Sequence, residues 1–187
     1  MNYDWIKTRA QFDEEKPAVI DPLKGTEWTY QELNIRAENL ANHLQEQGVK
    51  RGDVVGIFAP NDVSILDLLF ASFKIGAVYF PMNWRLKPNE IESVIEDSNI
   101  KMIFYSTRHL SSLQGIADEY LHLDIDSKEY DEIVDPKNYR PFESVDVRQD
   151  DLASLMYTSG TTGLPKGVMF TYESFTTNAV NTILTYK

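Results

Sequence analysis

Short apolar segments alternate with longer segments of helical periodicity along most of this sequence. Apolar runs stand at 54–58, 77–80 and 101–105, and apolar residues at helical spacing fill the stretches between them, at 62–75 and from Pro88 onward. Strands that alternate with helices of this length form right-handed crossover units whose strands run parallel. The sequence therefore predicts an α/β fold with a mainly parallel sheet flanked by helices.

Capping and turn residues predict where several elements begin and end. Residues 17–20 and 27–30 are typical of a short β-hairpin, and Thr29 stands three residues before Glu32, the spacing of a helix capping box. Glycine is favoured where a helix ends in a left-handed residue. The predicted cap and end residues are Thr29 and Gly48 for the first helix, and Asn61 and Gly76 for the second.

An acidic stretch at 126–151 shows little periodicity, and we interpret it as a surface connection rather than a domain linker. After it, 152–157 and 167–170 are predicted strands, and an apolar periodic pattern from Tyr172 predicts a final helix.

The composition excludes several classes of function. The chain has 187 residues, no cysteine and a net charge of −11. The lack of cysteine excludes disulfides and thiolate metal sites and is typical of a reducing, cytoplasmic setting. Because a large negative charge repels polyanions, we expect no nucleic-acid partner. The longest apolar stretch, 64–80, contains Asp67 and Lys74, so no transmembrane segment is predicted.

The segment 156–169, MYTSGTTGLPKGVM, joins the last two predicted strands. Its glycines allow positive φ and close backbone approach to a ligand, and its hydroxyls and one lysine suit phosphate oxygens. An ordinary hairpin turn would have a similar composition, so both interpretations remain open at this point. The segment lacks the Gly-Lys-Ser/Thr of the P-loop and the dinucleotide pattern G-x-G-x-x-G. The residues concerned are Thr158, Ser159, Gly160, Thr161, Thr162, Gly163, Lys166 and Gly167.

Residues 157–169, YTSGTTGLPKGVM, resemble the phosphate-binding signature of the adenylate-forming superfamily, which includes acyl-CoA synthetases, luciferases and peptide-synthetase adenylation domains. Thirteen consecutive residues match. The likeness continues at 28–44 and 68–86 and covers nearly the whole chain. Where the family often has a histidine, this chain has Tyr172. The resemblance implies an acetyl-CoA synthetase-like N-terminal domain, of which residues 1–187 are the first part.

Asn83, Arg85 and Leu86 resemble the acid–CoA ligase branch of this superfamily more than the peptide-synthetase branch. For Asn83 and Arg85, a capped and salt-bridged loop is favoured over contact with substrate.

The resemblance implies a reaction in two steps. A carboxylic acid, which we expect to be a fatty acid, attacks the α-phosphate of ATP; pyrophosphate leaves, and CoA then displaces AMP from the acyl-adenylate. Mg²⁺ bridges the phosphates, and no protein residue is assigned to the metal. The residues assigned to phosphate binding are Thr158, Ser159, Gly160, Thr161, Thr162, Gly163 and Lys166, with Lys166 also as the catalytic residue.

The resemblance also implies that adenine-binding, acid-binding and late catalytic segments lie outside this sequence. We therefore expect the chain alone to be inactive, its apolar faces to favour self-association, and residues 159–166 to be mobile without nucleotide. Two alternatives stay open: a peptide-synthetase adenylation domain, and a nucleotide-binding module without catalysis. The sequence does not identify the acid.

Overall fold

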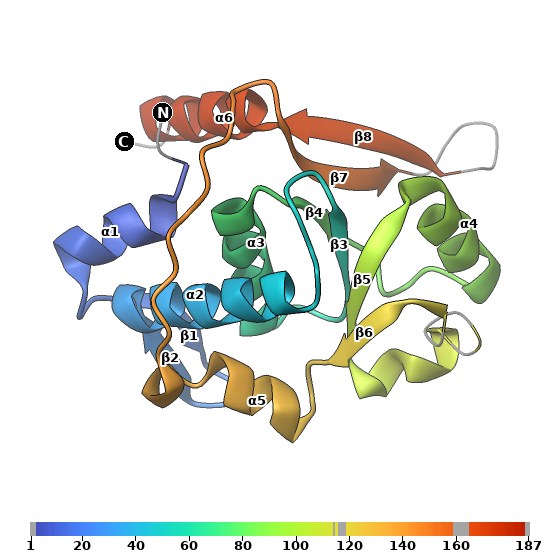
Figure 1. The fold of residues 1–187 in the computed structure, drawn as a ribbon, viewed down its shortest axis with the longest axis horizontal. Helices are drawn as coiled ribbons and strands as arrows, with labels where there is room; N and C mark the ends of the chain where they lie inside the picture. The colour runs from blue at the N-terminus through green and yellow to red at the C-terminus, as the bar shows by residue number, and fades with distance from the viewer. Residues whose placement is uncertain (1–2, 114, 116–118, 159–164, 186–187) are drawn as a thin grey trace.

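The computed structural model describes residues 3–113, 115, 119–158 and 165–185, which form one large sheet, helices on both of its faces and a separate hairpin (Figure 1). The hairpin consists of β1 (Pro17–Asp21) and β2 (Thr26–Thr29). The large sheet has six strands, in the spatial order β6 (Leu121–Asp124), β5 (Ile100–Tyr105), β3 (Val54–Phe58), β4 (Val78–Pro81), β7 (Leu152–Thr158) and β8 (Lys166–Thr171).

Neighbouring strands of the large sheet run parallel from β6 to β7, and β8 is antiparallel to β7. The helices are α1 (Trp5–Asp13), α2 (Tyr30–Glu46), α3 (Val63–Ile75), α4 (Pro88–Ser98), α5 (Lys128–Val134) and α6 (Tyr172–Thr185). The predicted α/β fold with a mainly parallel sheet is confirmed.

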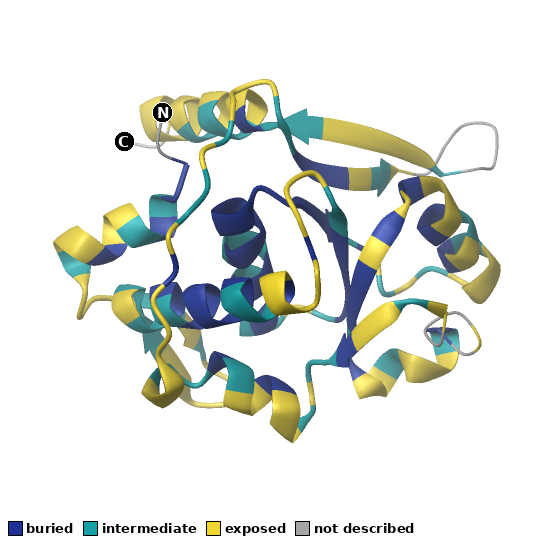
Figure 2. Cartoon of the chain, viewed as in Figure 1, coloured by how far each residue is buried: buried dark blue, intermediate teal, exposed yellow. Residues whose placement is uncertain are grey.

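Each face of the sheet has its own apolar core. On one face α2, α3 and α5 pack against side chains that include Val55, Ile57 and Phe104. On the other face α4 and a 3-10 turn at Thr107–Leu113 pack against side chains that include Phe58 and Ile103. Because successive strand residues point to opposite faces, β3 supplies both cores, and its buried residues lie at the centre of the molecule (Figure 2).

Most predicted element ends agree with the structure. The Thr29 side chain accepts a hydrogen bond from the Glu32 amide and the Glu32 carboxylate accepts one from the Thr29 amide, so the capping box is formed. Gly48 and Gly76 both have positive φ, at 79° and 69°. The predicted cap Asn61 was wrong: the carboxylate of Asp62 caps α3 by accepting from the Ser64 amide.

The interpretation of 126–151 as a surface connection was wrong for part of that stretch. It contains α5, whose Tyr130 and Val134 are buried against α2 and α3, and Phe142 is buried in the same core. Seven residues are about two helical turns, too few to produce a clear periodic signal in an acidic segment. Helix α1 and strand β6 were not predicted either.

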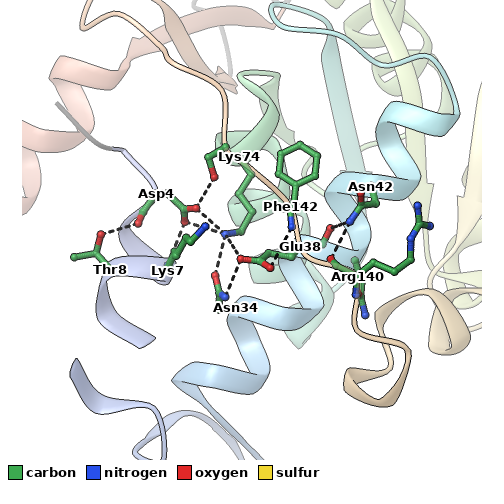
Figure 3. A network of polar contacts seen from close by, with 11 residues as sticks. Asp4, Lys7, Thr8, Asn34, Glu38, Asn42, Lys74, Arg140 and Phe142 are labelled. Atoms are coloured by element: carbon green, nitrogen blue, oxygen red, sulfur yellow. Dashed lines mark hydrogen bonds and ion pairs between the residues drawn. The ribbon is translucent and has the colours of Figure 1, made fainter. Parts of the chain in front are cut away.

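A buried lysine connects α1, α2, α3 and the segment after α5 (Figure 3). The ammonium of Lys74, whose side chain is 0% exposed, donates to both carboxylate oxygens of Asp4 and to the side-chain oxygen of Asn34. It also lies 3.6 Å from the carboxylate of Glu38. Ser144 donates to Asp4, and the Phe142 amide donates to Glu38. Burial lowers the pKa of Lys74, and the two carboxylates oppose that shift.

Candidate functional site

The β7–β8 hairpin places the two ends of the glycine-rich segment side by side. Thr158 is the last residue of β7, Lys166 is the first of β8, and the two are direct partners across the antiparallel pair. Both are exposed. The other predicted phosphate-binding residues, Ser159, Gly160, Thr161, Thr162 and Gly163, lie outside the described residues, as does most of the segment 159–166 for which we expect mobility.

The ammonium of Lys166 forms no ion pair with any carboxylate of the described residues. An exposed cation beside hydroxyl groups is a favourable partner for a phosphate. The described geometry therefore leaves Lys166 available to an anionic ligand.

Gly167 serves a different purpose from the one expected. Its φ is not among the positive values of the described glycines, and it continues the extended backbone of β8. A Cβ at this position would lie 3.1 Å from the Leu155 side chain and 3.3 Å from the ring of Tyr157. The glycine makes room for these side chains, and the positive φ that glycine allows is not used at this position.

The order of the strands opens a crevice beside this hairpin. From β3 the chain passes through α3 to β4, which lies on one side of β3 in the sheet. From β4 it passes through α4 to β5, which lies on the other side of β3. Right-handed crossovers in opposite directions place α3 and α4 on opposite faces of the sheet. The loops that follow β3 and β4 therefore separate, and ligands of open α/β sheets bind at such a point.

This crevice has a volume of about 680 Å³. Thr158 and Pro165 form part of its wall, so it borders both ends of the glycine-rich segment. Its apolar lining residues include Ile65, Phe80, Met82, Trp84, Met156 and Tyr157, and its polar ones Asn61, Asn83, Arg85 and Glu90. Another crevice, of about 450 Å³, is lined by residues of α1 and by residues 143–147 and includes neither Thr158 nor Pro165.

The loop after β4 combines an internal cap with an exposed cation. The Asn83 side chain accepts a hydrogen bond from the Arg85 amide, so the expected capped loop is confirmed. The expected salt bridge is wrong for the described residues, because Arg85 pairs with none of their carboxylates and its guanidinium lies 4.3 Å from the centroid of the Trp84 ring. Trp84 in turn packs against the His109 ring, at 4.9 Å.

Tyr172, the residue that departs from the family pattern, belongs to the core. Its side chain is 0% exposed and its ring lies 4.8 Å from that of Tyr3 and 5.0 Å from that of Phe73. Burial raises the pKa of the Tyr172 hydroxyl. This residue holds the start of α6 against Tyr3 and α3 and does not line the crevice.

No group of three or more histidine, aspartate or glutamate side chains in the described residues could hold a metal ion. Among the helices that the structure describes, none has both the length and the apolar character needed to cross a bilayer.

An open α/β sheet with a crevice between separating loops, bordered by the two ends of a glycine- and hydroxyl-rich segment, is typical of proteins that bind a phosphorylated ligand. The profile of the AMP-binding enzyme family matches residues 6–187. The chain belongs to this family of AMP-binding enzymes.

Individual relatives agree with this assignment. The chain is 36% identical over 180 residues to a feruloyl-CoA synthase of an Amycolatopsis species, a match that covers 96% of this chain and 35% of the relative. It is 30% identical over 188 residues to the long-chain-fatty-acid–CoA ligase FadD13 of Mycobacterium tuberculosis, covering 92% and 35%. The structure of ATP-bound MatB from Rhodopseudomonas palustris superposes with a TM-score of 0.82 at 27% identity, covering 98% and 37%. The chain thus spans about a third of the length of these relatives.

Proposed function

We propose that this chain is the N-terminal part of an acid–CoA ligase that activates a carboxylic acid with ATP and transfers the acyl group to CoA. The observation that carries the proposal is the position of the signature segment. Thr158 and Pro165, which flank its glycine- and hydroxyl-rich part, line the crevice where the strand order changes direction, and Lys166 is the direct strand partner of Thr158. The kinship with a feruloyl-CoA synthase and a fatty-acid–CoA ligase supports the same reaction class.

In this proposal the signature segment binds the triphosphate of ATP, which enters as its Mg²⁺ complex. Negative charge grows on the β- and γ-phosphates as the acid attacks the α-phosphate and pyrophosphate leaves. Backbone amides and hydroxyls of 158–163 donate hydrogen bonds to these oxygens, and Lys166 supplies a positive charge. Hydrogen bonds that strengthen as this charge develops stabilise the transition state more than the bound substrate.

We further propose that the acid carries an apolar group, with a fatty acid as the first candidate. One relative is named for feruloyl-CoA and another for long-chain fatty acids, and both of these acids carry a largely apolar group. The absence of cysteine and the net charge of −11 support a cytoplasmic setting without a nucleic-acid partner.

The proposed function is tested by acid-dependent exchange of pyrophosphate into ATP in the full protein. We expect exchange with fatty or arylpropenoic acids and formation of their CoA thioesters. Exchange with amino acids and no CoA thioester would instead favour the peptide-synthetase alternative, and ATP binding without exchange for any acid would favour a silent nucleotide-binding module.

The 187-residue chain on its own is expected to give no acid-dependent exchange, since the family resemblance implies that the adenine- and acid-binding segments lie downstream of the signature. The same assay, with the full protein as the positive control, checks this. Substrate-dependent turnover by the 187-residue chain would contradict the proposal that the reaction also needs the segments downstream of the signature.

The isolated chain is also expected to self-associate through the outer surface of β8 and α6 (Figure 2). Met169, Ile183 and Leu184 are 71%, 72% and 68% exposed, and β8 is an edge strand of the described sheet. Light scattering over a concentration series measures this, with an Ile183→Lys, Leu184→Glu variant as the control that should remain monomeric. A monomer at every concentration would refute it.

A further inference from the structure

The outer half of the β7–β8 hairpin extends beyond its neighbour in the sheet. The described register of β7 with β4 consists of the pair Tyr79 and Ser154, whereas β7 and β8 remain paired as far as Thr158 and Lys166. The end of the hairpin that carries the signature segment therefore depends on side chains for its attachment to the rest of the molecule.

One side chain in this outer half reaches another element through a hydrogen bond. The hydroxyl of Tyr157 donates to the Asp97 carboxylate near the end of α4, at 2.5 Å. Within the described residues, no other side-chain hydrogen bond joins 155–158 or 166–170 to a different part of the chain. A hydrogen bond to an ionised carboxylate is stronger than one between neutral groups.

The ring of Tyr157 makes packing contacts in addition to the hydrogen bond of its hydroxyl. It packs against Phe80 of β4 with centroids 5.3 Å apart, and it covers Gly167 on the opposite strand. Burial and the neighbouring Asp97 carboxylate both raise the pKa of the Tyr157 hydroxyl. A tyrosine hydroxyl is protonated at neutral pH even at its ordinary pKa, so it is a donor there. The side chain thus contacts β4, β8 and α4 together.

The partner helix forms part of the crevice. Glu90 and Val94 of α4 line it, as does Tyr157 itself. The bond from Tyr157 to Asp97 therefore joins the hairpin to the wall that faces it. Thr158 directly follows Tyr157, and Lys166 pairs with Thr158.

We infer that Tyr157 and Asp97 are positioning residues that hold the ends of the signature segment at the crevice in the arrangement that accepts ATP. This inference rests on the proposed function of that segment. If the pair is broken, the hairpin spends less time in the competent arrangement, and the apparent affinity for ATP falls in proportion to that fraction. Saturating ATP restores the arrangement, so the maximal rate changes little.

The test compares Tyr157→Phe and Asp97→Ala in the full protein, using exchange of pyrophosphate into ATP. We expect each variant to raise the KM for ATP about three- to tenfold, as the loss of one hydrogen bond implies, with kcat within about twofold of the parent protein. The double variant should be no worse than either single one, because both remove the same bond. Asp97→Asn, which keeps an acceptor, should restore part of the loss.

Glu96→Ala is the matched control, since it removes an exposed carboxylate from the adjacent position of α4. It should leave the KM unchanged. An unchanged KM in Tyr157→Phe, or an equal rise in the Glu96 control, overturns the inference.

Hydrogen exchange separates failure of this inference from failure of the proposed function. In Tyr157→Phe, backbone amides of 166–170 should exchange about three- to tenfold faster while those of β3 and β5 do not change. If the parent protein shows no exchange of pyrophosphate into ATP, the proposed function fails. The amide hydrogen exchange still shows whether Tyr157 holds the hairpin in place. Unchanged amide exchange at 166–170 would overturn the inference.

Discussion

Replacing Lys74 with methionine is expected to lower the free energy of unfolding by about 3–5 kcal/mol, the cost of removing one partner from a buried ionic group. The Lys74 ammonium lies between Asp4 and Glu38, whose side chains are each 2% exposed. Methionine fills a similar volume but leaves two buried carboxylates without that cation. Chemical denaturation of the parent and variant chains measures the difference.

A control at an exposed lysine and a triple variant at the network separate the effect of the buried charge from that of the substitution itself. Lys101→Met, at an exposed site on β5, should change the stability by less than about 0.5 kcal/mol. The triple variant Asp4→Asn, Glu38→Gln, Lys74→Met removes all three charges and should recover most of the loss, because no buried charge remains uncompensated. A loss below about 1 kcal/mol for Lys74→Met would contradict the role of this network.

Replacing Lys166 with alanine in the full protein is expected to reduce the rate of exchange of pyrophosphate into ATP by about 10²–10³-fold, the usual effect of removing one preorganised donor from developing negative charge. Lys166 is exposed, and none of the described carboxylates pairs with it, so its removal should cost little stability. Lys101→Ala is the matched control and should retain full activity. A rate within about threefold of the parent would exclude a catalytic role for Lys166.

The elements that the sequence predicted well are those defined by local chemistry. The capping box at Thr29 and Glu32, the left-handed Gly48 and Gly76, and the apolar strands β3, β4 and β5 each depend on residues a few positions apart. Helix α1 escaped prediction because only Ile6 and Ala10 are buried in it. Strand β6 has four residues, one of them buried, so no alternation was visible.

The candidate site was predictable only where it is continuous in sequence. The signature segment stood out by composition and by its family resemblance, and the structure places its ends, Thr158 and Lys166, together. The crevice could not be predicted, since it arises from the order of strands in the sheet. Tyr157 and Asp97 are 60 positions apart, and nothing local to either indicates the other.

The most direct test of the central claim is the affinity of the full protein for ATP after Thr161, Thr162 and Lys166 are all replaced with alanine. If the segment binds the triphosphate, equilibrium titration should give a Kd for ATP at least about tenfold higher than that of the parent. The free energy of unfolding should not change. An unchanged Kd together with an unchanged rate of pyrophosphate exchange would contradict the claim.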